Sequence, residues 1–185
     1  MSAEDPSHRF SRLFADTERE LLAYALRRVD RAEDAADVVA ETFLVAWRRL
    51  DRVPPGDDAR LWLYGVARRQ LANQRRGQLR RSRLADRLRV ELPAAAAATS
   101  VPEDHRVAAV HAALARLDEE DREILRLTSW EGLTPSEVAT VLGVPGVTIR
   151  SRLHRARKRL RLEVLQEDDE APTTASATFA TRAAP

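Results

Sequence analysis

Apolar residues recur every three or four positions along most of the chain, which predicts amphipathic helices. The pattern runs from Phe10 to about Arg89 and is broken once, by Pro54-Pro55-Gly56-Asp57-Asp58. This segment favours a polar turn because proline and glycine end helices. The periodicity resumes from about His105 to Leu165. No segment alternates apolar and polar residues as a half-buried strand does, so the predicted fold class is all-α.

The helical pattern divides the chain into two parts. Residues 90–104 include five consecutive alanines and are bounded by prolines, a composition typical of a flexible linker. Residues 166–185 are acidic and then rich in Ala, Thr and Pro, and are predicted to form a disordered tail. Residues 1–8 are predicted to be disordered as well. We therefore expect two small helical domains, at 9–89 and 105–165.

The second domain has the sequence pattern of a helix-turn-helix. Thr134-Pro135-Ser136-Glu137 is a capping box with proline at the first helical position, so a short helix is predicted to begin there. Gly143 ends this helix, and Thr148 is expected to cap a second helix that runs through Arg161. Acidic residues 118–121 mark the start of a preceding packing helix, where the helix dipole favours negative charge.

The second helix of this pair has an apolar stripe and a basic side. The stripe predicted to be buried consists of Ile149, Leu153, Ala156 and Leu160. Between Arg150 and Arg161 there are seven basic residues and no acid. A short capped helix, a glycine turn and a basic helix form the arrangement that enters the DNA major groove. The alternatives are an ordinary solvated face, or a basic helix that binds a membrane or an acidic partner.

The first domain carries an acidic helix. Asp30, Asp34, Asp37 and Glu41 follow one another at spacings of four, three and four, on a helix predicted over about residues 30–51. An acidic stripe repels DNA phosphates, so this side suits a basic protein partner. A solvated face explains the pattern equally well.

The helix after the turn has the opposite charge. From Arg60 to Arg89 there are ten Arg residues and one acid, with Trp62 and Tyr64 at the start. Aromatic rings beside arginines supply the stacking surfaces and positive charge that bind unpaired bases. The alternative interpretation is that at least one of these two rings is a core residue.

The composition narrows the classes of function. The net charge is only +2, and 30 of the 31 basic residues are Arg, which a GC-rich coding bias explains as simply as DNA binding does. The chain has no Cys, four scattered His residues and no glycine-rich phosphate loop, so we expect neither an enzyme nor a cofactor or metal site. No apolar run is long enough to cross a membrane and the N-terminus lacks a signal-peptide core, so we expect a cytoplasmic protein.

From Phe10 to Leu162 the chain resembles the sigma-70 family of RNA polymerase sigma factors, in its extracytoplasmic-function group. The resemblance rests on residues 34–44 with Trp47, on residues 62–76, and on residues 117–161 with Arg150-Ser151-Arg152-Leu153-His154-Arg155-Ala156-Arg157. It implies an alternative sigma factor that directs RNA polymerase to promoters. The implied partners are core RNA polymerase, through the clamp helices and flap region, promoter DNA and an anti-sigma factor.

The resemblance also implies a role for three sets of residues. The residues implied to bind core polymerase are Asp34, Asp37, Val38, Glu41, Thr42 and Phe43. Those implied to bind and open the −10 promoter element are Trp62, Tyr64, Arg68, Arg69, Asn73, Arg75 and Arg76. Those implied to bind the −35 element are Thr148, Arg150, Ser151, Arg152, His154, Arg155 and Lys158.

The chain departs from the family pattern at several positions, namely Ala36, Ala40, Asn73 and Val147. The family usually has Glu and Gln at the first two, often Asp at the third, and Gly at the fourth. Two rival functions stay open on the sequence alone. One is a helix-turn-helix regulator that acts without polymerase and binds a palindrome as a dimer. The other is an adaptor that binds RNA through its arginines without sequence preference.

Overall fold

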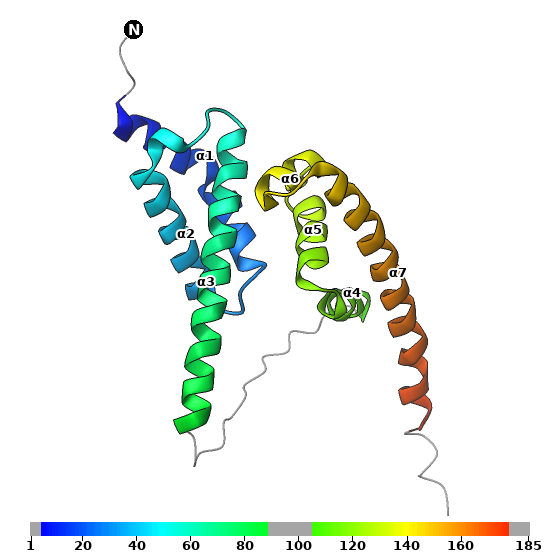
Figure 1. Cartoon of the computed structure of the whole chain (residues 1–185). Coiled ribbons are helices and arrows are strands. Elements are labelled where there is room, and N and C mark those ends of the chain that lie inside the picture. The colour runs from blue at the N-terminus through cyan, green and yellow to red at the C-terminus, as the bar shows by residue number, and fades with distance from the viewer. Residues whose placement is uncertain (1–4, 89–104, 178–185) are drawn as a thin grey trace, which may run out of the picture. The chain divides into compact units, whose positions relative to one another are not determined.

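The computed structural model describes the backbone of residues 5–88 and 105–177 and the side chains of residues 5–78, 80 and 110–165. These residues form seven α-helices and one short 3-10 helix, with no strand among them, which confirms the all-α prediction. The chain divides into two compact units (Figure 1). The N-terminal unit contains α1, α2 and α3, and the C-terminal unit contains α4, α5, α7 and the start of α6. The predicted linker, residues 90–104, lies outside the described residues.

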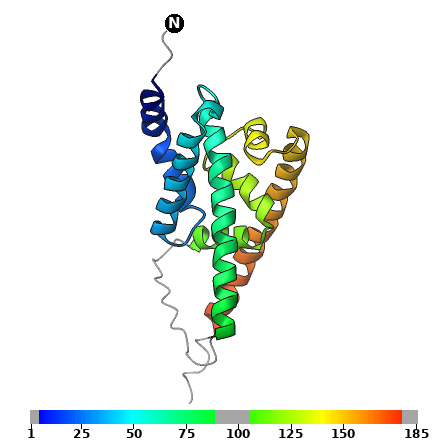
Figure 2. The same cartoon turned by 60° about the vertical axis from the view of Figure 1, so that its left-hand side comes forward.

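The N-terminal unit is a three-helix assembly. It consists of α1 (Pro6–Leu26), α2 (Ala32–Arg48), the 3-10 turn Leu50–Arg52 and α3 (Asp58–Leu88). The ribbons of α1 and α2 lie beside α3 in both views (Figures 1 and 2). The predicted turn before α3 is confirmed, and Gly56 supplies its positive φ of 63°, a conformation that costs other residues more.

Two boundaries in this unit differ from the sequence prediction. Helix α1 begins at Pro6, inside the segment predicted to be disordered, because the Asp5 carboxylate accepts a hydrogen bond from the Ser7 amide and proline is favourable at the first helical position. The helical stretch is also interrupted at residues 27–31, where Arg31 adopts an extended conformation before α2. The sequence predicted one break in the helical pattern over residues 10–89 and therefore missed this second one.

Aromatic stacking fixes the core of the N-terminal unit. The ring of Tyr24 on α1 stacks on that of Tyr64 on α3, with centroids 4.8 Å apart, and both residues are buried. The guanidinium of Arg28 lies 3.6 Å from the centroid of the Tyr24 ring and donates a hydrogen bond to the Tyr24 carbonyl. The stacked side chains of Arg28, Tyr24 and Tyr64 therefore join the end of α1 to the first half of α3.

The C-terminal unit forms the predicted capping box. Its helices are α4 (His105–Arg116), α5 (Glu119–Ser129) and α7 (Gly146–Ala177), with the start of α6 (Pro135–Leu142). The capping box is confirmed, since Thr134 Oγ1 accepts from the Glu137 amide and the Glu137 carboxylate accepts from the Thr134 amide. Gly143 follows α6 with a φ of 67° and starts the turn into α7.

Helix α7 is longer at both ends than the sequence predicted. It begins at Gly146, and the Pro145 carbonyl accepts hydrogen bonds from Thr148 and Ile149, so Thr148 lies in the first turn and is not the cap. The helix continues to Ala177, through residues predicted to be a disordered tail. Propagating an existing helix adds one hydrogen bond per residue without a new nucleation cost, which the local composition did not reveal. Residues 178–185 lie outside the described residues.

Candidate nucleic-acid interface

Helix α7 presents a polar and basic surface opposite its buried stripe. Ile149, Leu153 and Ala156 are at most 6% exposed, as the spacing predicted, whereas Leu160, the last member of the predicted stripe, is half-buried. Six residues predicted to bind DNA are exposed on the other side, namely Thr148, Arg150, Ser151, His154, Arg155 and Lys158. Six of the seven residues predicted to meet duplex DNA on this helix are therefore accessible.

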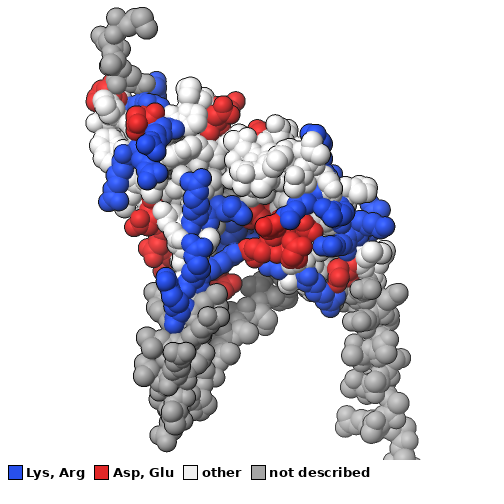
Figure 3. All heavy atoms as spheres, in the orientation of Figure 1, with Lys and Arg blue, Asp and Glu red and all other residues white. Residues whose placement is uncertain are grey.

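Arg152, the seventh, is engaged within the unit. It is half-buried and forms an ion pair with Glu120 at the start of α5. Arg159, seven positions further along α7, lies 3.4 Å from Asp118 and 3.1 Å from Asp121. The acidic side chains at the start of α5 lie beside the basic side chains of α7 (Figure 3). Arg152 therefore has an acidic neighbour on α5, and its contact with DNA stays a prediction.

Burial gives Asp121 an unusual titration. Its carboxylate is buried, and this burial raises its pKa above the ordinary value of 3.8, helped by the negative charge of Asp118 and opposed by Arg159 and Arg155. The folded state therefore holds the Asp121 proton more tightly than the unfolded chain does, so this group's contribution to stability falls as pH rises above 3.8. We expect an NMR titration to place the Asp121 midpoint above 3.8.

A matched variant checks the cause of this shift. In Asp118→Asn the amide still caps α5 but the neighbouring charge is gone, so the Asp121 midpoint should move toward its ordinary value. Asp121→Asn should lack the fall in stability above pH 3.8 that the ionising carboxyl contributes. A midpoint for Asp121 at or below the ordinary value in the unsubstituted protein would contradict this account.

Helix α3 carries the second basic surface. Arg69, Asn73 and Arg76 are exposed, and the Arg76 guanidinium donates a hydrogen bond to the side-chain amide oxygen, Oδ1, of Asn73. Trp62 and Arg68 are half-buried. A column of basic side chains follows α3 (Figure 3).

Two residues predicted to touch bases on α3 make contacts within the N-terminal unit. Tyr64 is 2% exposed and stacks in the core on Tyr24, so of the two candidate aromatic rings it is the core residue. Arg75 is half-buried and donates a hydrogen bond to the carbonyl of Arg28, at 3.4 Å. The prediction for Tyr64 is corrected, because its side chain lies on the face of α3 that packs against α1. Arg75 contacts the segment that follows α1, and its binding to bases stays a prediction.

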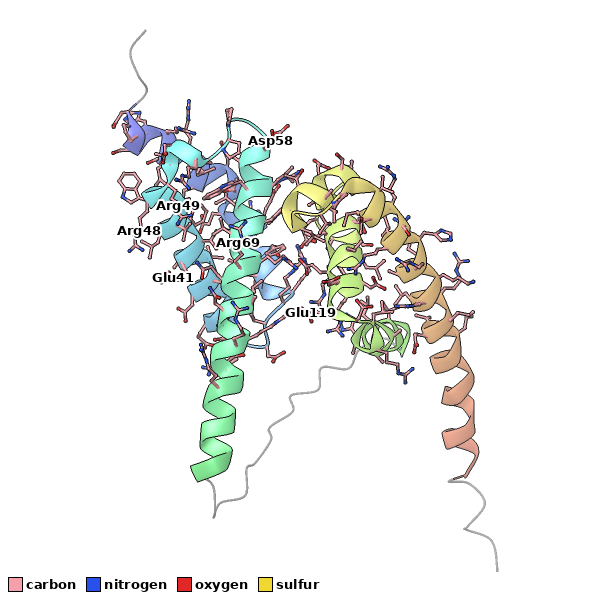
Figure 4. All side chains as sticks on the ribbon, in the orientation of Figure 1. Glu41, Arg48, Arg49, Asp58, Arg69 and Glu119 are labelled. Atoms are coloured by element: carbon pink, nitrogen blue, oxygen red, sulfur yellow. The ribbon has the colours of Figure 1, made fainter. Side chains whose placement is uncertain are left out.

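Helix α2 separates its predicted contact residues into two groups. Asp37 and Glu41 are exposed, and Glu41 lies with Arg48 at the edge of α2 away from α3 (Figure 4). Val38, Thr42 and Phe43 are at most 5% exposed. The prediction that these three side chains contact a partner directly is corrected, because they fill the core that supports the exposed face of α2.

Asp34 joins α2 to α3. Its carboxylate accepts a hydrogen bond of 2.7 Å from Gln74 and a longer one of 3.4 Å from Gln78. It also lies in the first turn of α2, where the helix dipole favours negative charge. The predicted partner-binding acid is thus part of an internal link, which the acidic stripe in the sequence did not reveal.

Asp34→Ala should destabilise the N-terminal unit. Loss of the carboxylate leaves the two glutamine amides without this acceptor and removes a favourable helix-dipole contact, for a loss of about 1 kcal/mol. Urea denaturation measures this change. Asp37→Ala is the matched control, because Asp37 is exposed on the same helix and should change stability by less than about 0.5 kcal/mol. Equal losses in both variants would show that the link to α3 contributes nothing.

An exposed aromatic patch lies across α1 and α2. Phe14, Leu44 and Trp47 are 38%, 43% and 47% exposed, and the Trp47 ring packs edge-on against Phe10 at 5.1 Å. We call these four residues the aromatic patch. Large apolar side chains gathered at the surface mark sites of protein association. The individual side chains of the patch were not predicted as contacts, although Leu44 and Trp47 lie outside the apolar stripe of α2, a signal that the sequence contains.

The two units match two family models. The model described as Sigma-70 region 2 matches residues 13–81, and the model described as Sigma-70, region 4 matches residues 108–160. The first range covers α2, the aromatic patch except Phe10, and the basic part of α3. The second covers the helix-turn-helix and the exposed side of α7.

Curated and solved proteins agree with these matches. The chain is 35% identical over 154 residues to the ECF RNA polymerase sigma factor SigL of Mycobacterium tuberculosis, covering 80% of this chain and 83% of SigL. It is 33% identical over 159 residues to the RNA polymerase sigma factor CnrH of Cupriavidus metallidurans, with coverages of 80% and 83%. The sigma factor RpoE of Bartonella quintana, solved with the anti-sigma factor NepR, aligns with a TM-score of 0.64 at 27% identity, over 85% of this chain and 96% of RpoE.

These findings define the chain as a transcription initiation factor with two sigma-type units. It belongs to the extracytoplasmic-function (ECF) group of the sigma-70 family of RNA polymerase sigma factors. It is an alternative sigma factor that directs promoter-specific transcription, and nothing in the comparisons favours a regulator that acts without polymerase. Within the part of the chain that the structure describes, no helix has the length and apolar character to span a membrane.

Proposed function

We propose that the exposed face of α2 and the aromatic patch bind the core RNA polymerase. The face combines the carboxylates of Asp37 and Glu41 with the rings of Trp47 and Phe14. Aromatic residues supply most of the binding energy in protein interfaces, and charged residues around them steer the partner. The patch suits a basic and apolar surface such as the polymerase clamp helices, and the acids keep it away from DNA.

The exposed side of α3 is proposed to bind unpaired bases of the −10 element. Arg68, Arg69 and Arg76 place positive charge near Asn73, and the half-buried ring of Trp62 offers a stacking surface. Binding that favours unpaired over paired bases shifts the promoter toward its open state. Tyr64 and Arg75 support this surface from within the unit.

The exposed side of α7 is proposed to bind the −35 element as duplex. The side chains nearest the start of the helix, Thr148, Arg150 and Ser151, lie where a recognition helix meets base edges. His154, Arg155 and Lys158 lie further along, where backbone phosphates are the nearer target. Arg152 supports this surface through its ion pair with Glu120 on α5.

The tether between the two units, the place of action and an inhibitory partner are also part of the proposal. Two domains, with residues 90–104 as the tether between them, allow two promoter elements to be bound at once. The protein catalyses no reaction itself and acts in the cytoplasm. An anti-sigma factor is a proposed partner, because RpoE of Bartonella quintana was solved in complex with the anti-sigma factor NepR. CnrH was likewise solved in a complex, with the cytosolic domain of CnrY.

The observation that carries the proposal is the separation of one aromatic and acidic surface from two basic surfaces on different units. The sequence has no cysteine, so a single introduced cysteine can carry a DNA-cleaving chelate at a known place. Arg80→Cys on α3 and Arg161→Cys on α7 are suitable because both residues are exposed. In complexes with core polymerase, cleavage should occur near −10 from the first and near −35 from the second. Cleavage at the same position from both would overturn the assignment.

A further inference from the structure

Val147 is an apolar side chain placed among polar ones on the surface of α7. It is 68% exposed, the highest value among the large hydrophobic residues that the structure shows at the surface. It lies in the first turn of α7, one position after Gly146 and one before Thr148. The Val147 side chain therefore does not serve to fill the core of the C-terminal unit.

Helical spacing puts Val147 on the DNA-facing side of α7. Val147, Ser151, His154 and Lys158 follow one another at spacings of four, three and four, and all four are exposed. The buried stripe, with Ile149, Leu153 and Ala156, occupies the opposite side. Val147 is thus the apolar member, nearest the helix start, of the surface proposed to meet the −35 duplex.

The chemistry of the major groove supplies a ligand for such a side chain. Thymine is the base that presents a methyl group there, and apolar side chains in a recognition helix distinguish it by contact with that methyl. Valine carries two methyl groups on a stiff side chain, and its position in the first turn is where a recognition helix approaches base edges. The residue that the family pattern usually has here, glycine, has no side chain to make this contact.

We propose that Val147 determines specificity at the −35 element by contacting the C5-methyl group of a thymine. This inference rests on the proposed binding of α7 to the −35 duplex. Arg150 and Ser151 read hydrogen-bonding groups of the bases, and Val147 adds a preference for thymine that those residues do not supply.

Removing single methyl groups from the DNA tests the proposal. On a promoter that the protein uses with core polymerase, each −35 thymine is replaced in turn by deoxyuridine, which lacks only the methyl group. Open-complex formation should weaken about fourfold at one position, the effect of burying roughly one methyl group. With Val147→Gly the same replacement should have no effect. Leu162→Ala is the matched control, because Leu162 is an exposed apolar residue further along α7 and should leave the penalty unchanged.

Each outcome separates this inference from the proposed function. If no initiation depends on the −35 sequence, the assignment of α7 to that element fails. If initiation depends on it but no thymine methyl group matters, or Val147→Gly keeps the full penalty, the assignment stands and the role of Val147 is wrong. If Val147→Gly lowers initiation by the same factor on the thymine and the deoxyuridine templates at every position, the preference for thymine does not come from Val147, and its role in reading thymine is overturned.

Discussion

Trp47→Ala should raise the dissociation constant for core RNA polymerase by about 30-fold, the largest effect we expect of a single substitution at the partner-binding surface. Interface tryptophans that lose their side chain typically cost about 2 kcal/mol or more, which corresponds to that factor. Trp47 is 47% exposed and sits beside Phe10 in the aromatic patch, so its ring is available to a partner. Fluorescence or interferometric titration of core polymerase with the purified variant measures the change.

The C-terminal unit offers a matched control for this substitution. Trp130 follows α5 and is 45% exposed, so Trp130→Ala removes a ring of similar accessibility that does not belong to the aromatic patch. Its dissociation constant should stay within about threefold of the unsubstituted protein, as expected for surface positions outside an interface. Thermal unfolding of both variants checks that the N-terminal unit stays folded without the contact between Trp47 and Phe10. Equal losses of affinity, or none for Trp47→Ala, would place the polymerase contact elsewhere.

Arg150→Ala should remove most discrimination between a promoter and a version with a scrambled −35 element. A bidentate contact between an arginine and a guanine contributes about 1–3 kcal/mol of discrimination, so the ratio of initiation rates should fall by about tenfold or more. Arg150 is exposed in the first turns of α7, where base edges are nearest. Transcription in vitro from the paired templates, with the variant and core polymerase, gives this ratio directly.

Arg152→Ala separates base recognition from general charge. It removes the same charge two positions along α7, but Arg152 is half-buried and paired with Glu120. This variant should lose stability in the C-terminal unit and keep the discrimination ratio of the unsubstituted protein at a temperature where it is folded. If Arg152→Ala lost the ratio and Arg150→Ala kept it, the orientation of α7 on DNA would be the reverse of the one proposed.

Much of the fold follows from the sequence because periodicity and capping are local signals. The stripe of Ile149, Leu153 and Ala156 is buried as spacing predicts, and the capping box at Thr134 is formed. Boundaries were less predictable. Helix α1 starts earlier than expected because one aspartate caps it, and α7 continues through polar residues whose composition is typical of disorder.

The sequence predicted the charge and aromatic character of the candidate surfaces better than it predicted which individual side chains form them. The sequence alone cannot distinguish Arg150 from Arg152, because which arginine meets an acid depends on how α5 packs against α7. In the same way, Trp62 and Tyr64 are both aromatic residues near arginines, and only the packing of α1 shows that Tyr64 belongs to the core. The exposed rings of the aromatic patch were not predicted as contacts, because apolar residues are expected to be buried in the core.

A sigma factor must support promoter-specific initiation together with core polymerase. The direct measurement adds the purified protein to bacterial core RNA polymerase on a library of upstream regions from the source genome and sequences the transcripts. We expect transcripts that require the protein and that share −10 and −35 sequences at a fixed spacing. Binding to a palindrome in the absence of polymerase, with no transcript that depends on the protein, would contradict the account.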